Sequence, residues 1–216
     1  MKLNTIVVVD DNKRHKKNKP LNLEMNFVME IFRYYLKKIV LDGSKKISIH
    51  FDDKAEKRYV KDSYFHVSSY YVENEKVRYL QEVKQSEKPN IFLSIIVDVL
   101  IDIANINKCE DSVIEQINIA KNKVIESGFE LEKEIKKYAI NEGNKKLRVY
   151  RKINKEGEMW YLRVQQGKTS IKEYKLLPKP ANISQEHIFD KCVCNGNVVI
   201  FYEKFGRVLV EIDLDI

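Results

Sequence analysis

Seven residues in the last third of the chain have the types and spacing to bind an anionic partner. They are the cationic and tyrosine side chains of three short alternating runs: Arg148, Tyr150, Lys152, Tyr161, Arg163, Lys172 and Tyr174. Because successive side chains of a strand point to opposite faces, we expect all seven on one face of a sheet. Cations bind phosphates or carboxylates and aromatic rings stack on bases, so this face suits single-stranded nucleic acid or an acidic protein. A solvated sheet face covered by long polar side chains explains the same pattern.

The charge of the chain is concentrated around these residues. The formal net charge is +7, and the segment from Asn141 to Pro180 holds eleven Lys or Arg against four Glu. The segment from Ala181 to Ile216 holds three basic residues against six acidic ones. This uneven distribution favours an anionic partner at one place on the surface.

The triplet Glu82-Val83-Lys84 is the alternative candidate, and it suits metal-dependent hydrolysis. It closes an alternating run that begins at Lys76. It resembles the third motif of the PD-(D/E)xK nucleases, in which a carboxylate and a lysine on one strand face hold a divalent metal and polarise the attacking water. The resemblance implies that Asp62, Glu82 and Lys84 are catalytic and that Mg²⁺ or Mn²⁺ is the cofactor.

The wider resemblance to these nucleases rests on the expected order of one helix, three strands and a second helix. It implies a further metal carboxylate, Glu24 or Glu30, on the first helix. The chain departs from the family pattern at Lys61, where the family has a proline. Triplets of an acidic residue, any residue and lysine occur five times in the chain, as its composition predicts.

Two smaller groups have the chemistry of metal ligands. Asp98 and Asp102 lie one helical turn apart, but Ser94 continues the same polar stripe, so a solvated helix face explains them as well. Cys192 and Cys194 put two thiols on one face of an extended segment. A structural zinc site needs about four ligands, so we expect buried free cysteines and no metal site there.

The elements that must position these residues are predicted from hydrophobic periodicity. A short β-branched run, Thr5 to Val9, predicts a strand that ends in the turn residues Asp10 and Asp11. The other predicted elements are a helix over 21–41, strands over 46–51, 63–72 and 76–84, a core helix from Asn90 and a second helix from Ser112 to Ile135. Five further strands are predicted over 147–153, 158–165, 170–177, 197–203 and 207–214.

This order predicts an α+β fold. We expect an N-terminal helix and a short mixed sheet packed on two central helices, followed by a C-terminal five-stranded antiparallel sheet or small barrel. Near Gly143 the predicted elements change from mixed helices and strands to strands alone. This change divides the chain into 1–142, an α/β region with the central helices, and 143–216, an all-β region. One continuous α+β domain is the alternative.

Composition narrows the function further. No G-x-G-x-x-G or G-x-x-x-x-G-K pattern occurs, which argues against nucleotide-binding enzymes of those two kinds. Three cysteines cannot all pair, and the apolar run from Ile91 to Ile106 is short and carries two Asp, so we expect a cytoplasmic protein with no membrane span. We therefore expect a non-catalytic binding protein without a cofactor, of the kind found among bacterial or phage inhibitor and immunity proteins. Its partner would be an acidic protein or nucleic acid, and the sequence does not indicate an oligomeric state.

Overall fold

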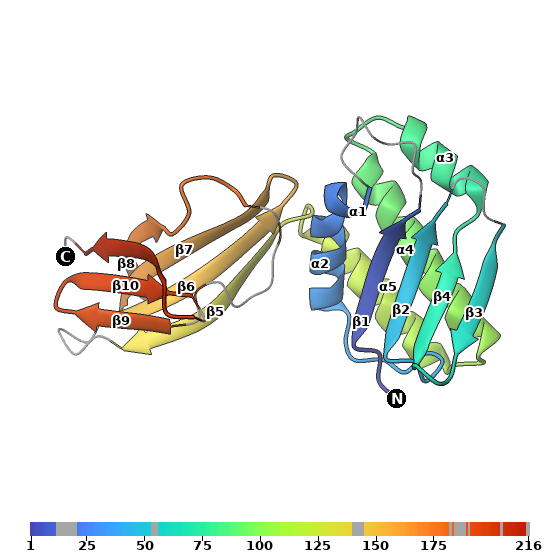
Figure 1. Cartoon of the computed structure of the whole chain (residues 1–216), viewed down its shortest axis with the longest axis horizontal. Coiled ribbons are helices and arrows are strands. Elements are labelled where there is room, and N and C mark those ends of the chain that lie inside the picture. The colour runs from blue at the N-terminus through green and yellow to red at the C-terminus, as the bar shows by residue number, and fades with distance from the viewer. Residues whose placement is uncertain are drawn as a thin grey trace. The chain divides into compact units, whose positions relative to one another are not determined.

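A mainly parallel sheet organises the N-terminal part of the chain in the computed structural model (Figure 1). Strands β1 (Thr5–Asp10), β2 (Lys46–Phe51) and β4 (Val67–Tyr71) run parallel, and β3 (Arg58–Asp62) pairs antiparallel with β4 at one edge. The order across the sheet is β1-β2-β4-β3. Period-two alternation in β2 buries Ile47, Ile49 and Phe51 completely on one face.

Helices pack on that buried face and at the carboxyl ends of the parallel strands (Figure 1). They are α1 (Leu21–Glu24), α2 (Asn26–Tyr35), α3 (Asn74–Glu82), α4 (Lys88–Ile106) and α5 (Asp111–Glu126). Figure 1 shows α4 and α5 behind the strands, and α2 packs against both of these helices. The Phe51 and Phe92 rings stack with centroids 5.6 Å apart, which fixes α4 against β2.

The predicted core helix is confirmed as α4, which begins at Lys88 with Pro89 in its first turn. Its length and its mean hydropathy of 1.7 are those of a membrane-crossing helix, but half of its apolar window is buried inside the fold. Core helices of proteins outside membranes share these properties, so they indicate a membrane only weakly.

Two sheets form the C-terminal part of the chain. Strands β5 (Leu131–Ala139), β6 (Lys145–Asn154), β7 (Gly157–Gln166) and β8 (Thr169–Lys175) pair antiparallel in that order. Strands β9 (Lys191–Asn195), β10 (Val198–Tyr202) and β11 (Val208–Asp213) form a second sheet with β10 in the middle. Side chains of both sheets share one apolar core, which includes Leu147, Trp160, Leu162, Val199 and Phe201. The arrangement is a sandwich, and the expected five-stranded sheet or small barrel is wrong in this detail.

The hairpin between β6 and β7 depends on Gly157. Its φ of +126° suits glycine, and a Cβ there would collide with the carbonyl of Ala181. The close approach lets the backbones of Glu158 and Ala181 exchange two hydrogen bonds of 2.9 Å. This bridge holds the chain that follows β8 against the start of β7.

The structure describes residues 1–11, 21–52, 56–139, 145–181, 183, 189, 191–203 and 205–214. The chain separates into two compact units, Met1–Phe129 and Glu130–Ile216. The division therefore falls ahead of the boundary expected near Gly143, because the strand β5 belongs to the second unit. The prediction of a mixed α+β fold is confirmed.

Four predicted elements differ from the observed ones. The strand expected over 63–72 begins only at Val67, because residues 63–66 form the turn between β3 and β4. The helix expected to run to Ile135 ends at Glu126, where Gly128 and Phe129 both take positive φ angles. The run from Lys76 is the helix α3, because the buried residues are Val77 and Leu80, three apart. The long N-terminal helix is broken at Met25 and ends at Tyr35.

Candidate functional site

Five of the seven predicted binding residues lie together on one side of the β5–β8 sheet. The pairing of β6 with β7 sets Arg148 opposite Arg163 and Tyr150 opposite Tyr161, and Lys152 opposite Met159. Their neighbours along the strands, among them Val149 and Leu162, are buried in the core, so the five point away from it. We call this side of the sheet the outer face, defined by Arg148, Tyr150, Lys152, Tyr161 and Arg163.

The other two predicted residues lie on the opposite side, so the prediction of one shared face is wrong for Lys172 and Tyr174. Lys172 pairs with Val164 and Tyr174 with Leu162, and the tyrosine packs against the core. A bulge between Val164 and Gln165 shifts the alternation of β7 relative to β8. Glu173 and Lys175 take the outer positions instead.

Carboxylates on or next to the neighbouring strands form ion pairs with the cations of the outer face. Glu132 on β5 accepts from Arg163 Nη2 at 3.0 Å, and Glu173 on β8 accepts from Arg163 Nε. Glu134 lies 2.5 Å from Arg148 Nη1, and Glu130, just before β5, lies 2.8 Å from Lys152 Nζ. The outer face therefore alternates positive and negative groups and is not the uniformly basic surface that the sequence predicts.

Arg163 is the most constrained side chain of this face. Its guanidinium carbon lies 4.3 Å from the centre of the Tyr150 ring, and its edge is held by the two carboxylates. The hydrogen bonds to Glu132 raise the pKa of Arg163, and in return they lower the pKa of Glu132. The planar group is thus fixed in place and stays charged.

The residues of the nuclease interpretation do not form a metal site. Glu82 ends the helix α3 and Lys84 follows it, both exposed, so the strand that should carry them does not exist. Asp62 closes the far end of β3, where its carboxylate accepts from the backbone N–H of Tyr64 at 2.9 Å. Figure 1 shows α3 at the opposite end of the sheet from that end of β3. The prediction is therefore wrong in its geometry.

The two further carboxylates of the nuclease interpretation form ion pairs with basic side chains. Glu24 lies 3.7 Å from the ammonium of Lys88, and Glu30 lies 2.9 Å from Arg33. Within the described part of the chain, no three His, Cys, Asp or Glu side chains come together as a metal-binding group.

Asp98 and Asp102 line a cleft of about 240 Å³ in the first unit. Lys57 lies 2.6 Å from Asp102, which also accepts from the Tyr70 hydroxyl at 2.5 Å. Burial alone would raise the pKa of Asp102, but the hydrogen bonds from Lys57 and Tyr70 outweigh it and lower the pKa. Asp98 lies 3.4 Å from Lys76. Each aspartate is therefore paired with a lysine.

The two neighbouring cysteines point into the core of the second unit. Cys192 pairs with Phe201 and Cys194 with Val199, both fully buried residues of β10. Burial, and then the neighbouring Cys194, raise the pKa of Cys192 to about 12. At neutral pH the group is therefore a thiol and not a thiolate. This agrees with the expectation of free cysteines packed as small apolar residues.

A row of polar contacts at the carboxyl ends of β1, β2 and β4 was not predicted. Asp11 Oδ2 lies 2.8 Å from His50 Nδ1, and the His50 ring stacks on Tyr71 with centroids 4.5 Å apart. The guanidinium carbon of Arg58, on the neighbouring strand β3, lies 4.0 Å from the centre of the Tyr71 ring. Alternation along β2 places His50 on the face away from Ile49 and Phe51, but the sequence gives no strand order, so its partners could not be identified.

Comparison of the chain with protein-family models, with curated proteins and with solved structures gave no match. The function is therefore argued from the geometry of the outer face itself.

Proposed function

We propose that the protein is a non-catalytic binding protein whose outer face contacts a protein partner. The observation that carries the proposal is the alignment of Arg148 with Arg163 and of Tyr150 with Tyr161 on neighbouring strands, directed away from the core. Tyrosine and arginine are enriched at the centres of protein interfaces, where flat, rigid side chains lose little entropy on binding. Arg163 meets this condition because Tyr150 and two carboxylates already hold it.

The pattern of charge supports a protein partner over nucleic acid. Affinity for nucleic acid comes mainly from cations that neutralise phosphates and release counterions. Here Arg148, Lys152 and Arg163 are neutralised by glutamates of the same sheet. A phosphate would have to displace those glutamates, whereas a protein surface can present groups of both signs.

The hydrogen-bond donors of Arg148 favour a partner that presents an acidic group at this position. A guanidinium has five N–H donors, and the contact with Glu134 uses one nitrogen, Nη1. Its Nε is buried and has no hydrogen-bond partner among the described residues. A partner carboxylate over Arg148 would use the remaining donors on the Nη nitrogens, because the buried Nε does not reach the surface. The three free cysteines support a reducing compartment such as the cytoplasm as the place of this interaction.

The proposal is tested by comparing two matched double variants of the full chain. Tyr161→Ala with Arg163→Gln removes the partly buried centre of the outer face. Phe205→Ala with Arg207→Gln removes an aromatic residue and an arginine that are both exposed, near the turn between β10 and β11. Each is used to capture proteins from lysate of the cells that make the protein, with quantitative mass spectrometry. We expect a protein that wild type and the Phe205/Arg207 variant retain equally and that the outer-face variant loses by about tenfold or more.

Two measurements decide between this proposal and its rivals. Fluorescence anisotropy with labelled single-stranded DNA and RNA at about 150 mM salt should show no binding; binding that weakens steeply with salt would indicate nucleic acid instead. Equal capture by all three proteins would show that the outer face is only a solvated surface. Glutamine replaces Arg163 because a new glutamate would meet Glu132 and Glu173 and disturb the sheet.

A further inference from the structure

A cleft of about 240 Å³ lies beside the edge strand β1 in the first unit. Its sides are the first residues of β1 and the extended chain that leaves α2. The N–H of Leu3 donates to the carbonyl of Ile39 at 2.8 Å, which ties these two segments together. Leu3, Ile6, Leu36 and Ile39 supply the apolar part of its lining, and Leu3, Ile6 and Ile39 are buried.

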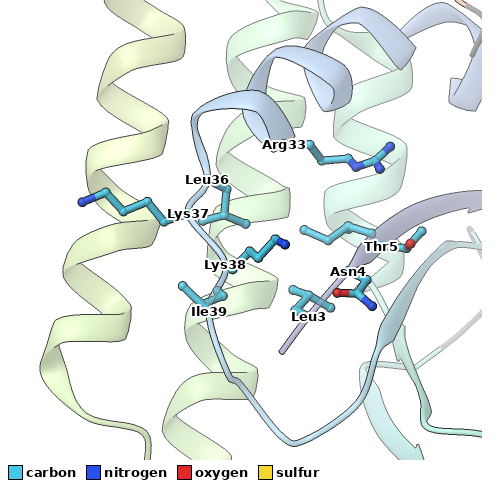
Figure 2. Close-up of a pocket in the computed structure, with 9 residues that line it drawn as sticks. Leu3, Asn4, Thr5, Arg33, Leu36, Lys37, Lys38 and Ile39 are labelled. Carbon is cyan, nitrogen blue, oxygen red and sulfur yellow. The ribbon is translucent and has the colours of Figure 1, made fainter. Parts of the chain in front are cut away.

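Cations from two elements reach toward β1 over this apolar lining. Figure 2 shows Arg33, from the last turn of α2, and Lys38, from the chain after it, both extending to the side on which Asn4 and Thr5 lie. Lys37 extends to the other side, away from those residues. Among the described residues that line the cleft there is no carboxylate. The cleft thus combines two positive charges on one side, the polar groups of Asn4 and Thr5, and an apolar surface.

We propose that this cleft binds a small organic anion, a carboxylate or phosphate joined to a short apolar group. The charged end would lie between Arg33 and Lys38, and the apolar end against Leu3 and Ile39. A cleft of about 240 Å³ has room for roughly eight water molecules at about 30 Å³ each, which is the size of a short-chain fatty acid. Cations near the end of a helix also stabilise its carboxyl end, but that role does not account for the apolar lining beside Arg33 and Lys38.

Glu30 modulates the positive charge of the cleft. It lies 2.9 Å from Arg33 on the next turn of α2, with both side chains partly exposed. A bound anion competes with Glu30 for the guanidinium. Replacing Glu30 by glutamine therefore favours the ligand, whereas replacing Arg33 removes the group that both anions need.

The test uses the full chain and four small probes: hexanoate, hexyl phosphate, acetate and hexanol. Isothermal titration calorimetry gives the affinity, and amide NMR shifts locate the site. We expect hexanoate or hexyl phosphate to bind about tenfold more tightly than acetate, which lacks the apolar chain, or hexanol, which lacks the charge. Whichever of the two anions binds more tightly identifies the headgroup. Shifts should fall on Leu3 to Ile6 and Arg33 to Ile39.

Variants make the result specific to the cleft. Arg33→Gln and Lys38→Gln should each weaken hexanoate about fivefold or more, Lys37→Gln should change it by less than about twofold, and Glu30→Gln should tighten it. Equal binding of hexanol and hexanoate would overturn the proposal. So would equal weakening by Lys37→Gln and Lys38→Gln, since that would show unspecific attraction to the net charge. None of these residues belongs to the outer face, so the outcome does not depend on the proposed function.

Discussion

The carboxylate of Asp42 in the first unit accepts hydrogen bonds from several side chains and from the backbone. It is buried after the helix α2, where the Tyr59 hydroxyl donates to its carboxylate at 2.6 Å and the backbone N–H of Ser44 at 2.8 Å. The hydroxyls of Ser68 and Ser44 donate to it as well. Burial would raise the pKa of Asp42, but these four hydrogen bonds outweigh it and lower the pKa below 3.8, the value of an unperturbed aspartate. The sequence predicts none of this, because the donors come from three separate segments.

Asp42→Asn should destabilise the protein by about 2 kcal/mol at neutral pH, because the donors of Tyr59 and Ser68 then meet an amide. Since the folded pKa lies below the unfolded one, the stabilisation is complete well above pH 3.8 and is lost as the pH falls through the folded value. The difference between wild type and variant should therefore shrink below about pH 4. Urea unfolding at several pH values measures this. Glu82→Gln, at an exposed helix end, is the control and should change stability by less than about 0.5 kcal/mol.

The thiol of Cys192 should be almost inert in the folded protein. With a pKa of about 12 instead of 9.0, its thiolate fraction near pH 8 is about a thousandfold lower than in the unfolded chain. Alkylation by iodoacetamide, followed by peptide mass spectrometry with and without denaturant, should show a difference in rate of this order. Similar rates in both conditions would mean that β9 opens readily and that Cys192 is not held in the core.

At the scale of the strand, alternation predicted β6 and β7 well and failed where a bulge intervenes. In β5 the bulge between Glu134 and Lys136 gives Leu131, Ile135 and Tyr138 the spacing of a helix, although all three lie at the core. The sequence therefore predicted a helix there and missed the strand that supplies Glu132 and Glu134 to the outer face. The tyrosine and arginine alignment was predictable from residue types alone, but the neutralising carboxylates were not, because they depend on which strand lies beside β6.

The ion pair between Glu132 of β5 and Arg163 of β7 crosses the intervening strand β6, and its strength is measurable as a coupling energy. Arg163 makes two contacts with Glu132, and the side chains are 24% and 40% exposed, so we expect a coupling of about 0.5 to 1 kcal/mol. A double-mutant cycle of Glu132→Gln and Arg163→Gln, followed by urea unfolding, gives this value. The pair of Arg207 with Glu203, whose arginine is 74% exposed, is the matched comparison and should couple more weakly. Equal coupling in the two cycles would mean that Arg163 is not rigidly held.

At the scale of the molecule, the two units have different ways of burying polar groups. The first unit satisfies a lone buried carboxylate, Asp42, with neutral donors. The second unit buries a complete ion pair, Arg151 with Glu158 at 2.7 Å, and Glu158 also accepts from the indole of Trp160 at 3.2 Å. Removing either member of that pair would leave an uncompensated charge in the core. Each unit has its own core, so each should fold on its own.

The location of the boundary follows from the role of β5, and it gives the last prediction. A fragment of residues 130–216 keeps β5, and a fragment of residues 143–216 removes it and exposes the edge of β6, together with Ile153, which pairs with Leu131. We expect the longer fragment to unfold cooperatively and to give a dispersed amide NMR spectrum. The shorter one should be unfolded or aggregated, because it also loses Glu130, Glu132 and Glu134 from the outer face. Identical spectra from the two fragments would instead show that β5 is dispensable. The second unit would then begin near Gly143, where the sequence predicts a change to strands alone.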